Sequence, residues 1–254
     1  MCRHLAYLGP PLALATLLLD PPHSLVRQTY APVDMRGGGT INVDGFGAGW
    51  YPDGATTPIR YRRAAPMWTD SSFAALARNV SSRAVIAAVR SATPGMPVID
   101  TACAPFSTDR WLFSHNGRIM GWPHSVATLA ARLPVTDLLT LEAPTDSALL
   151  WALVRHRLMA GDSLGRALSA VATEVLAAAP GSRLNLLVTD GAMLAATTVH
   201  HALAVLAGDG AVLVCSEPTD QAEGWQPVPD GHLLTATSST VDVAPIPATT
   251  AEEP

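Results

Sequence analysis

The sequence predicts an α+β fold in a single domain. Strand-like segments gather towards both ends of the chain, two helices lie between them, and the composition suits a large core. Of the 254 residues, 48% are hydrophobic and 15% are charged, far from the composition of disordered chains. No segment has the composition of a linker, so one domain over residues 1–243 is expected. Residues 244–254 lack periodicity and are expected to form a disordered tail.

Four short strands are expected in the first half of the chain. Residues 5–8 are mostly apolar, residues 46–51 (FGAGWY) form a strand interrupted by glycines, and residues 84–90 (AVIAAVR) form an apolar run of strand length. Residues 111–114 form another strand, and the following His115-Asn116-Gly117 has turn chemistry.

Two helices are expected in the middle of the chain. Thr145-Asp146 caps the first, which runs to about Ala160, and Gly161 ends it. The second runs from about Ser163 to Ala179. Strands are then expected at residues 184–189, 193–198, 211–215 and 233–237.

The charged residues and cysteines exclude several functions. All sixteen basic residues are arginines, which excludes enzymes that need a Schiff-base or P-loop lysine. The net charge is -5 without any basic run, so no nucleic-acid partner is expected. No apolar stretch reaches the ~18 residues that span a membrane, and no signal-peptide cleavage site follows residues 12–19. Three scattered cysteines predict free thiols in the cytoplasm, with Cys103 and Cys215 as small packing residues.

Three familiar motifs are rejected. Residues 161–165 (GDSLG) match the G-x-S-x-G pattern, but they follow a helix and are better explained as a helix end and the next cap. Cys2 and His4 are two candidate ligands and do not make a metal site. Residues 37–39 (GGG) and 45–49 (GFGAG) lack the spacing of a dinucleotide site. No metal and no cofactor is therefore expected.

Cys2 is the strongest catalytic candidate. After removal of Met1 it would carry a thiol and a free α-amine. An α-amine with a pKa of about 7.7–8.0 can act as a general base near neutrality, and a thiolate is a strong nucleophile. One residue can therefore supply nucleophile and base; the alternative is an inert terminal cysteine.

Four other residues fit acyl-transfer chemistry. Asn116 and Gly117 offer two neighbouring donors for an oxyanion, or simply form a type I′ turn. Arg90 can hold a carboxylate in a bidentate fork, or form a structural salt bridge. Asp146 starts a helix and is first of all a cap.

Four separated motifs occur together and in order: Cys2, VRSATPG around Arg90, SHNG at 114–117 and PTDS at 144–147. The set resembles the class II glutamine amidotransferases, which are N-terminal-nucleophile hydrolases, over roughly residues 2–240. The opening MCRHLAYLGPP and the later VCSEPTD resemble one branch more closely, the amidohydrolases of ergothioneine biosynthesis. A histidine that many relatives carry two residues before the arginine is Ala88 here.

The resemblance implies a four-layer αββα sandwich and a set of roles. Cys2 would attack a γ-glutamyl carbonyl, and Asn116 and Gly117 would form the oxyanion hole. Arg90 would bind the glutamyl α-carboxylate, and Asp146 the α-ammonium.

The branch implies γ-glutamyl-hercynylcysteine S-oxide as a small-molecule substrate, cleaved to glutamate and hercynylcysteine S-oxide. No synthase domain fits after residue 240, so no obligate synthetase partner is expected. A glutaminase subunit that feeds a synthetase and a non-catalytic glutamyl-binding protein remain as alternatives. An aromatic face can bind the trimethylammonium group, and the candidates are Trp50, Trp68, Trp111 and Trp122.

Overall fold

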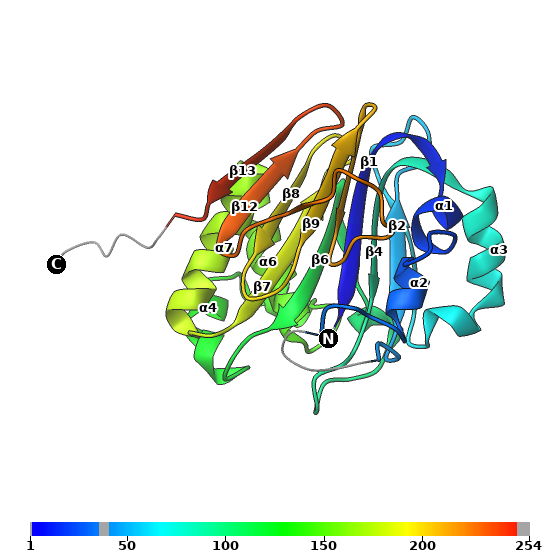
Figure 1. The fold of residues 1–254 in the computed structure, drawn as a ribbon. Helices are drawn as coiled ribbons and strands as arrows, with labels where there is room; N and C mark the ends of the chain where they lie inside the picture. Colours follow the sequence, from blue (N-terminus) through cyan, green and yellow to red (C-terminus); the bar gives the residue numbers. More distant parts are fainter. Residues whose placement is uncertain (1, 36–40, 248–254) are drawn as a thin grey trace.

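Two antiparallel sheets form the centre of the computed structural model, which describes residues 2–35 and 41–247 (Figure 1). The first sheet contains β1 (Arg3–Ala13), β2 (Phe46–Trp50), β3 (Ile59–Arg63), β4 (Ser81–Val89), β9 (Ala204–Gly208), β10 (Ala211–Cys215) and β11 (Gln226–Pro227). The second contains β5 (Phe106–Thr108), β6 (Trp111–Arg118), β7 (Arg183–Thr189), β8 (Leu194–Thr198), β12 (His232–Ala236) and β13 (Val241–Pro245). Their spatial orders are β11-β9-β10-β1-β4-β2-β3 and β13-β12-β8-β7-β6-β5.

Helices cover the outer faces of both sheets. The first sheet carries α1 (Leu14–Leu18), α2 (Leu25–Gln28) and α3 (Ser71–Asn79) (Figure 1). The second carries α4 (Ala127–Ala130), α6 (Asp146–Met159) and α7 (Leu164–Ala178), with α5 (Val135–Leu139) beside α6. Short 3-10 helices occur at Met67–Thr69, Asp100–Ala102 and His124–Val126. Within the described ranges, no helix has the length and apolar character needed to cross a membrane.

Three layers of apolar side chains separate the four layers of backbone. Buried pairs represent each of them: Ile86 and Leu187 between the sheets, Phe46 and Phe73 under α3, and Leu168 and Val188 under α7. The expected α+β class and the αββα order of layers are therefore confirmed.

The two long helices begin at the expected residues. The Thr145 hydroxyl caps α6 by accepting from the Ala148 amide at 3.2 Å, and the Ser163 hydroxyl caps α7 by accepting from the Arg166 amide at 3.3 Å. Gly161 lies between them with φ +97°, a conformation that favours glycine. Ser163 is thus a helix cap, not a strained nucleophile.

Two expectations about local structure are wrong. His115-Asn116-Gly117 is not a turn, because β6 continues to Arg118 and pairs with β7 throughout. The predicted tail from residue 244 is wrong at its first two positions, since β13 pairs with β12 through Pro245. The rest of that tail, from residue 248, and the glycine run at 37–39 lie outside the described residues.

Cys103 and Cys215 are both buried and free of disulfides, as expected. Burial raises the pKa of the Cys103 thiol to about 11 and also raises the pKa of Cys215. Both thiols therefore stay protonated and unreactive near neutral pH.

Gly47 in β2 provides a test of the packing. A Cβ at this position would lie 2.3 Å from the Ala104 carbonyl oxygen and 3.0 Å from the Tyr61 carbonyl oxygen. Because both atoms belong to the backbone, Gly47→Ala should lower the free energy of unfolding by about 1–3 kcal/mol. Thermal unfolding followed by circular dichroism should show a Tm several degrees below that of wild type.

The matched control is Gly208→Ala at the end of β9, where a Cβ would meet no heavy atom within 4 Å. Its Tm should not fall. An unchanged Tm for Gly47→Ala would contradict the close contact between β2 and the segment at Ala104.

Candidate active site

Cys2 lies immediately before β1 and lines a small cavity. Its side chain is half-buried, and its thiol donates to the Ser91 carbonyl oxygen at a distance of 3.7 Å. The same cavity is lined by Arg90, His115 and Ser147. The nucleophile candidate therefore shares a concave space with a cation that the sequence also singles out.

Arg90 follows β4 and lies beside Cys2. The register pairs Arg3 with Val89, so the residues before Arg3 and after Val89 are neighbours. Arg90 Nη1 donates to the Pro97 carbonyl oxygen at 2.9 Å. Across residues 2–35 and 41–247 no carboxylate forms an ion pair with Arg90, which leaves guanidinium donors for a ligand carboxylate.

Asn116 lies on β6, in the opposite sheet. Its Nδ2 donates to the Ser216 hydroxyl at 3.3 Å, and the same hydroxyl accepts from the His4 amide at 3.0 Å. The amide is thereby tied to β1, the strand that carries Cys2. Since an Asn amide has two hydrogens, one remains for a developing oxyanion.

Gly117 follows Asn116 where β6 and β7 approach closely. A Cβ on Gly117 would lie 1.9 Å from the Arg183 carbonyl oxygen, so no residue with a side chain fits. The close strand pairing explains the glycine, and the turn expected from the sequence does not.

Asp146 is the first residue of α6 and is 6% exposed. Its two carboxylate oxygens accept from the backbone amides of Ile119 and Ser147, at 3.0 and 2.8 Å. In the described chain no arginine pairs with it. The side chain is not among those lining the Cys2 cavity, although the next residue, Ser147, is.

His115 also lines the Cys2 cavity, although the sequence indicates no role for it beyond its place in the SHNG motif and the expected turn. Its Nε2 donates to the Arg183 carbonyl oxygen at 3.0 Å, and since a carbonyl can only accept, Nδ1 accepts from the Ser147 hydroxyl at 2.9 Å. Burial lowers the pKa of His115, against an opposing effect of Asp146. The ring is therefore neutral and fixed in one tautomer.

A buried ion pair fixes the backbone on the other side of Cys2. Arg3 Nε donates to Glu217 Oε1 at 2.5 Å, and both side chains are 3% exposed. Arg3 Nη1 also donates to the Cys2 carbonyl oxygen at 3.0 Å. The second Glu217 oxygen accepts from His23 Nε2 at 2.7 Å and from the Val33 amide at 2.8 Å. His23 and Glu217 are 194 positions apart, so no local sequence pattern could predict their contact.

Known proteins resemble this chain over most of its length. A family model described as class-II glutamine amidotransferases matches residues 20–207. A protein from Mycolicibacterium smegmatis named gamma-glutamyl-hercynylcysteine sulfoxide hydrolase is 42% identical over 246 residues, which cover 97% of this chain and 100% of the relative. A protein of the same name from Mycobacterium tuberculosis (strain CDC 1551 / Oshkosh) is 41% identical over 95% of both chains.

A solved structure is also similar over nearly the whole chain. It is described as a glutamine aminotransferase class-II domain protein from Silicibacter pomeroyi, and it superposes with a TM-score of 0.68 at 25% identity. The superposition covers 97% of this chain and 100% of that one. The family match, the two relatives and this structure together show that the chain belongs to the class II glutamine amidotransferases.

Proposed function

We propose that the chain hydrolyses the γ-glutamyl amide bond of γ-glutamyl-hercynylcysteine sulfoxide, with Cys2 as the nucleophile. The names of two relatives at 41–42% identity support the substrate. The observation that carries the chemistry is the shared cavity of Cys2 and Arg90, which lie side by side on neighbouring strands. The products would be glutamate and hercynylcysteine sulfoxide.

The proposed reaction proceeds through a thioester and requires prior removal of Met1. The α-amine of Cys2 takes the thiol proton, and Sγ attacks the γ-carbonyl carbon. Asn116 and Gly117 donate to the oxyanion of the tetrahedral intermediate. The C–N bond then breaks as the α-amine returns the proton to the leaving nitrogen. Water, deprotonated by the same amine, attacks the thioester, releases glutamate and restores the thiol.

Two charged residues would recognise the glutamyl group. Arg90 suits the α-carboxylate because its guanidinium has donors without an ion-pair partner in the described chain. Asp146 suits the α-ammonium because it is buried beside the cavity and, among the described residues, receives only backbone hydrogen bonds. The α-ammonium can reach a carboxylate oxygen of Asp146 either directly or through one bridging water.

The proposal includes a setting and a set of partners. Free thiols at Cys2, Cys103 and Cys215 are consistent with the reducing cytoplasm. The partner is the small-molecule substrate, and no synthetase is needed to receive ammonia, because the amide nitrogen of this substrate leaves on the second product.

Replacement of the nucleophile is the direct test. Cys2→Ala should lower glutamate release from γ-glutamyl-hercynylcysteine sulfoxide by about a thousandfold or more, because no covalent intermediate can form. Coupled detection of glutamate measures the rate. Cys215→Ala, which alters a buried thiol in the core of the first sheet, should retain activity.

The same assay separates the alternatives. Glutamate release that survives in Cys2→Ala would refute the nucleophile, and a clear preference for free glutamine would favour a glutaminase that supplies a synthetase. Mass spectrometry of the purified N-terminus should show that Met1 is absent, since a retained Met1 would leave Cys2 without an α-amine.

Arg90→Lys tests recognition of the glutamyl carboxylate. Lysine keeps the positive charge but cannot form a bidentate fork. The loss of one charged hydrogen bond is worth about 1.5–3 kcal/mol, so kcat/KM should fall by about 10- to 150-fold, mainly through KM. Arg78→Lys, in an exposed pair with Asp20, is the control and should leave both constants unchanged. An unaltered KM in Arg90→Lys would remove Arg90 from the proposed site.

A further inference from the structure

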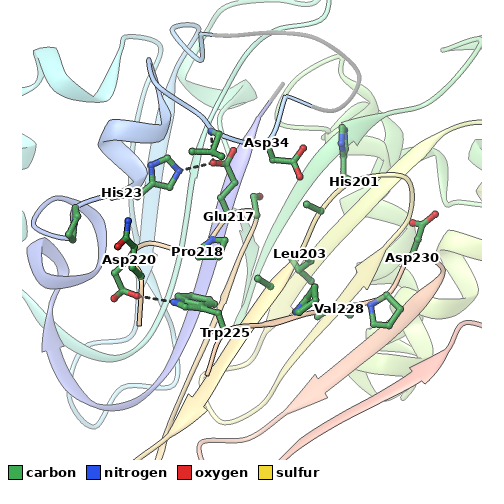
Figure 2. A pocket seen from close by; sticks show the side chains of 18 residues that line it. His23, Asp34, His201, Leu203, Glu217, Pro218, Asp220, Trp225, Val228 and Asp230 are labelled. Carbon is green, nitrogen blue, oxygen red and sulfur yellow. Dashed lines mark hydrogen bonds and ion pairs between the residues drawn. The ribbon is translucent and has the colours of Figure 1, made fainter. Parts of the chain in front are cut away.

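A second, much larger cavity lies beside the end of β10 (Figure 2). We call it the β10 cavity; its lining includes His201, Leu203, Glu217, Asp220, Trp225 and Val228. It encloses about 1030 Å³, at the upper end of the range for small-molecule sites, about 300–1,000 Å³. No step of the proposed reaction has yet used it.

The β10 cavity and Arg90 lie on opposite sides of Cys2. The first strand, β1, pairs with β4 on one edge and with β10 on the other, with Leu5 opposite Cys215. The Ser216 amide continues this register by donating to the His4 carbonyl oxygen at 2.9 Å. Neighbouring strands are about 4.8 Å apart. A substrate held at Arg90 by its glutamyl end can therefore extend past Cys2 towards β10.

A narrow gap leads from Asn116 to the β10 cavity. Arg3 and Asn116 line it, and it shares Asp34, His201 and Ser216 with the larger space. Figure 2 shows Asp34 and His201 at the same end of the β10 cavity. The oxyanion-hole candidate and the large cavity are thus joined by common walls.

Two residues that line this gap each have a buried polar atom with no hydrogen-bond partner within the described chain. These atoms are Nε2 of His201 and Oδ1 of Asn116, and the two residues are 5% and 2% exposed. Burial lowers the pKa of His201 to about 3, so its ring is neutral at pH 7. Unsatisfied buried polar atoms are rare in proteins, and a polar ligand in the gap would satisfy these two.

The charges around the β10 cavity favour a cationic ligand. Its described lining contains carboxylates at Asp34, Glu217, Asp220 and Asp230 and no arginine. Arg3 offsets the charge of Glu217. Asp220 accepts from Trp225 Nε1 at 2.9 Å, and Asp230 accepts from the His200 amide at 2.6 Å. In the described chain neither of these two aspartates pairs with an arginine.

Trp225 supplies an aromatic face within this negative surrounding. Its Nε1 is held by Asp220, which fixes the ring at the wall of the cavity (Figure 2). A quaternary ammonium group donates no hydrogen bond, and aromatic rings with nearby carboxylates are the usual way to bind it.

The four tryptophans considered from the sequence do not line the β10 cavity. Trp50 and Trp111 are buried elsewhere, at 6% and 8% exposure. Trp68 contacts Tyr30 edge-on, with ring centroids 5.5 Å apart, and Trp122 is partly buried against the core between the second sheet and its helices.

We infer that the β10 cavity binds the leaving group of the substrate, and that Trp225 and the neighbouring Asp220 recognise a quaternary ammonium group on it. The inference rests on the proposed function for the identity of that leaving group. The two residues set specificity and take no part in bond cleavage.

Binding of the free product tests the inference without any need for turnover. Isothermal titration of hercynylcysteine sulfoxide into the Cys2→Ala protein should give saturable binding. Adding Trp225→Leu should weaken the Kd about tenfold or more, as expected for loss of a desolvated cation–π contact. Adding Asp220→Asn, which removes the charge and keeps an oxygen acceptor for Trp225 Nε1, should weaken it several-fold. Trp68→Leu, which changes an exposed tryptophan outside the cavity, is the matched control and should leave Kd unchanged.

A second ligand separates charge recognition from general packing. The analogue in which hydrogen replaces the trimethylammonium group should bind weakly and about equally to the Trp225 variant and its control. Equal Kd values for hercynylcysteine sulfoxide in the Trp225→Leu, Asp220→Asn and Trp68→Leu proteins would overturn the inference, and so would an absence of binding to Cys2→Ala. Failure of the proposed function would appear separately, as wild type that releases no glutamate from the conjugate.

Discussion

The pairing of β1 with two strands at once is the constraint on which the site depends. β4 holds one edge of β1 and β10 holds the other, so the residues before and after these strands meet around Cys2. Backbone hydrogen bonds thus bring residues from three distant parts of the sequence to one end of the sheet. A shift of β1 by one residue would turn its side chains to the opposite faces. It would also move Arg3 away from Glu217.

The interior between the sheets is polar near Cys2 and apolar further away. His4, Ser114, Asn116 and Ser216 are all buried there and linked by hydrogen bonds. Burial lowers the pKa of His4 to about 3, so this cluster remains uncharged at neutral pH. A neutral hydrogen-bonded cluster can occupy a core without an ion's desolvation cost. The cluster holds Asn116 in place. The charged groups near Cys2 are instead Arg90 and the buried Arg3–Glu217 pair.

The sequence allowed prediction of the elements that have local signals. The caps at Thr145 and Ser163 and the apolar run of β4 depend on neighbouring residues, and each element lies close to its expected position. The turn predicted at His115-Asn116-Gly117 is wrong. Asn-Gly favours turns locally, whereas here the close approach of the Arg183 backbone requires the glycine inside β6. The proximity of Arg90 to Cys2 was expected only by resemblance, since sheet register sets it.

Apart from VCSEPTD at residues 214–220, which the resemblance includes, the residues of the β10 cavity have no local signal in the sequence. Trp225 lies in an irregular segment, and Glu217 pairs with Arg3 across 214 positions. Neither hydrophobic periodicity nor motif spacing reports such contacts, and the aromatic candidates chosen from the sequence were different tryptophans.

The residues around Cys2 lie in or next to paired strands, whereas those of the β10 cavity lie mostly in a loop, and the two sets differ in how readily they can be substituted. Cys2 and Arg90 adjoin paired strands, and Asn116 and Gly117 lie within one, so their positions are fixed by ladders that tolerate little variation. Most acidic and aromatic groups of the β10 cavity come instead from residues 217–230, which outside β11 form no regular strand or helix. Insertions and substitutions are tolerated far better in such a segment. Under the proposed function, remodelling this one loop would change which second product is accepted, while the paired strands would keep the residues around Cys2 in place.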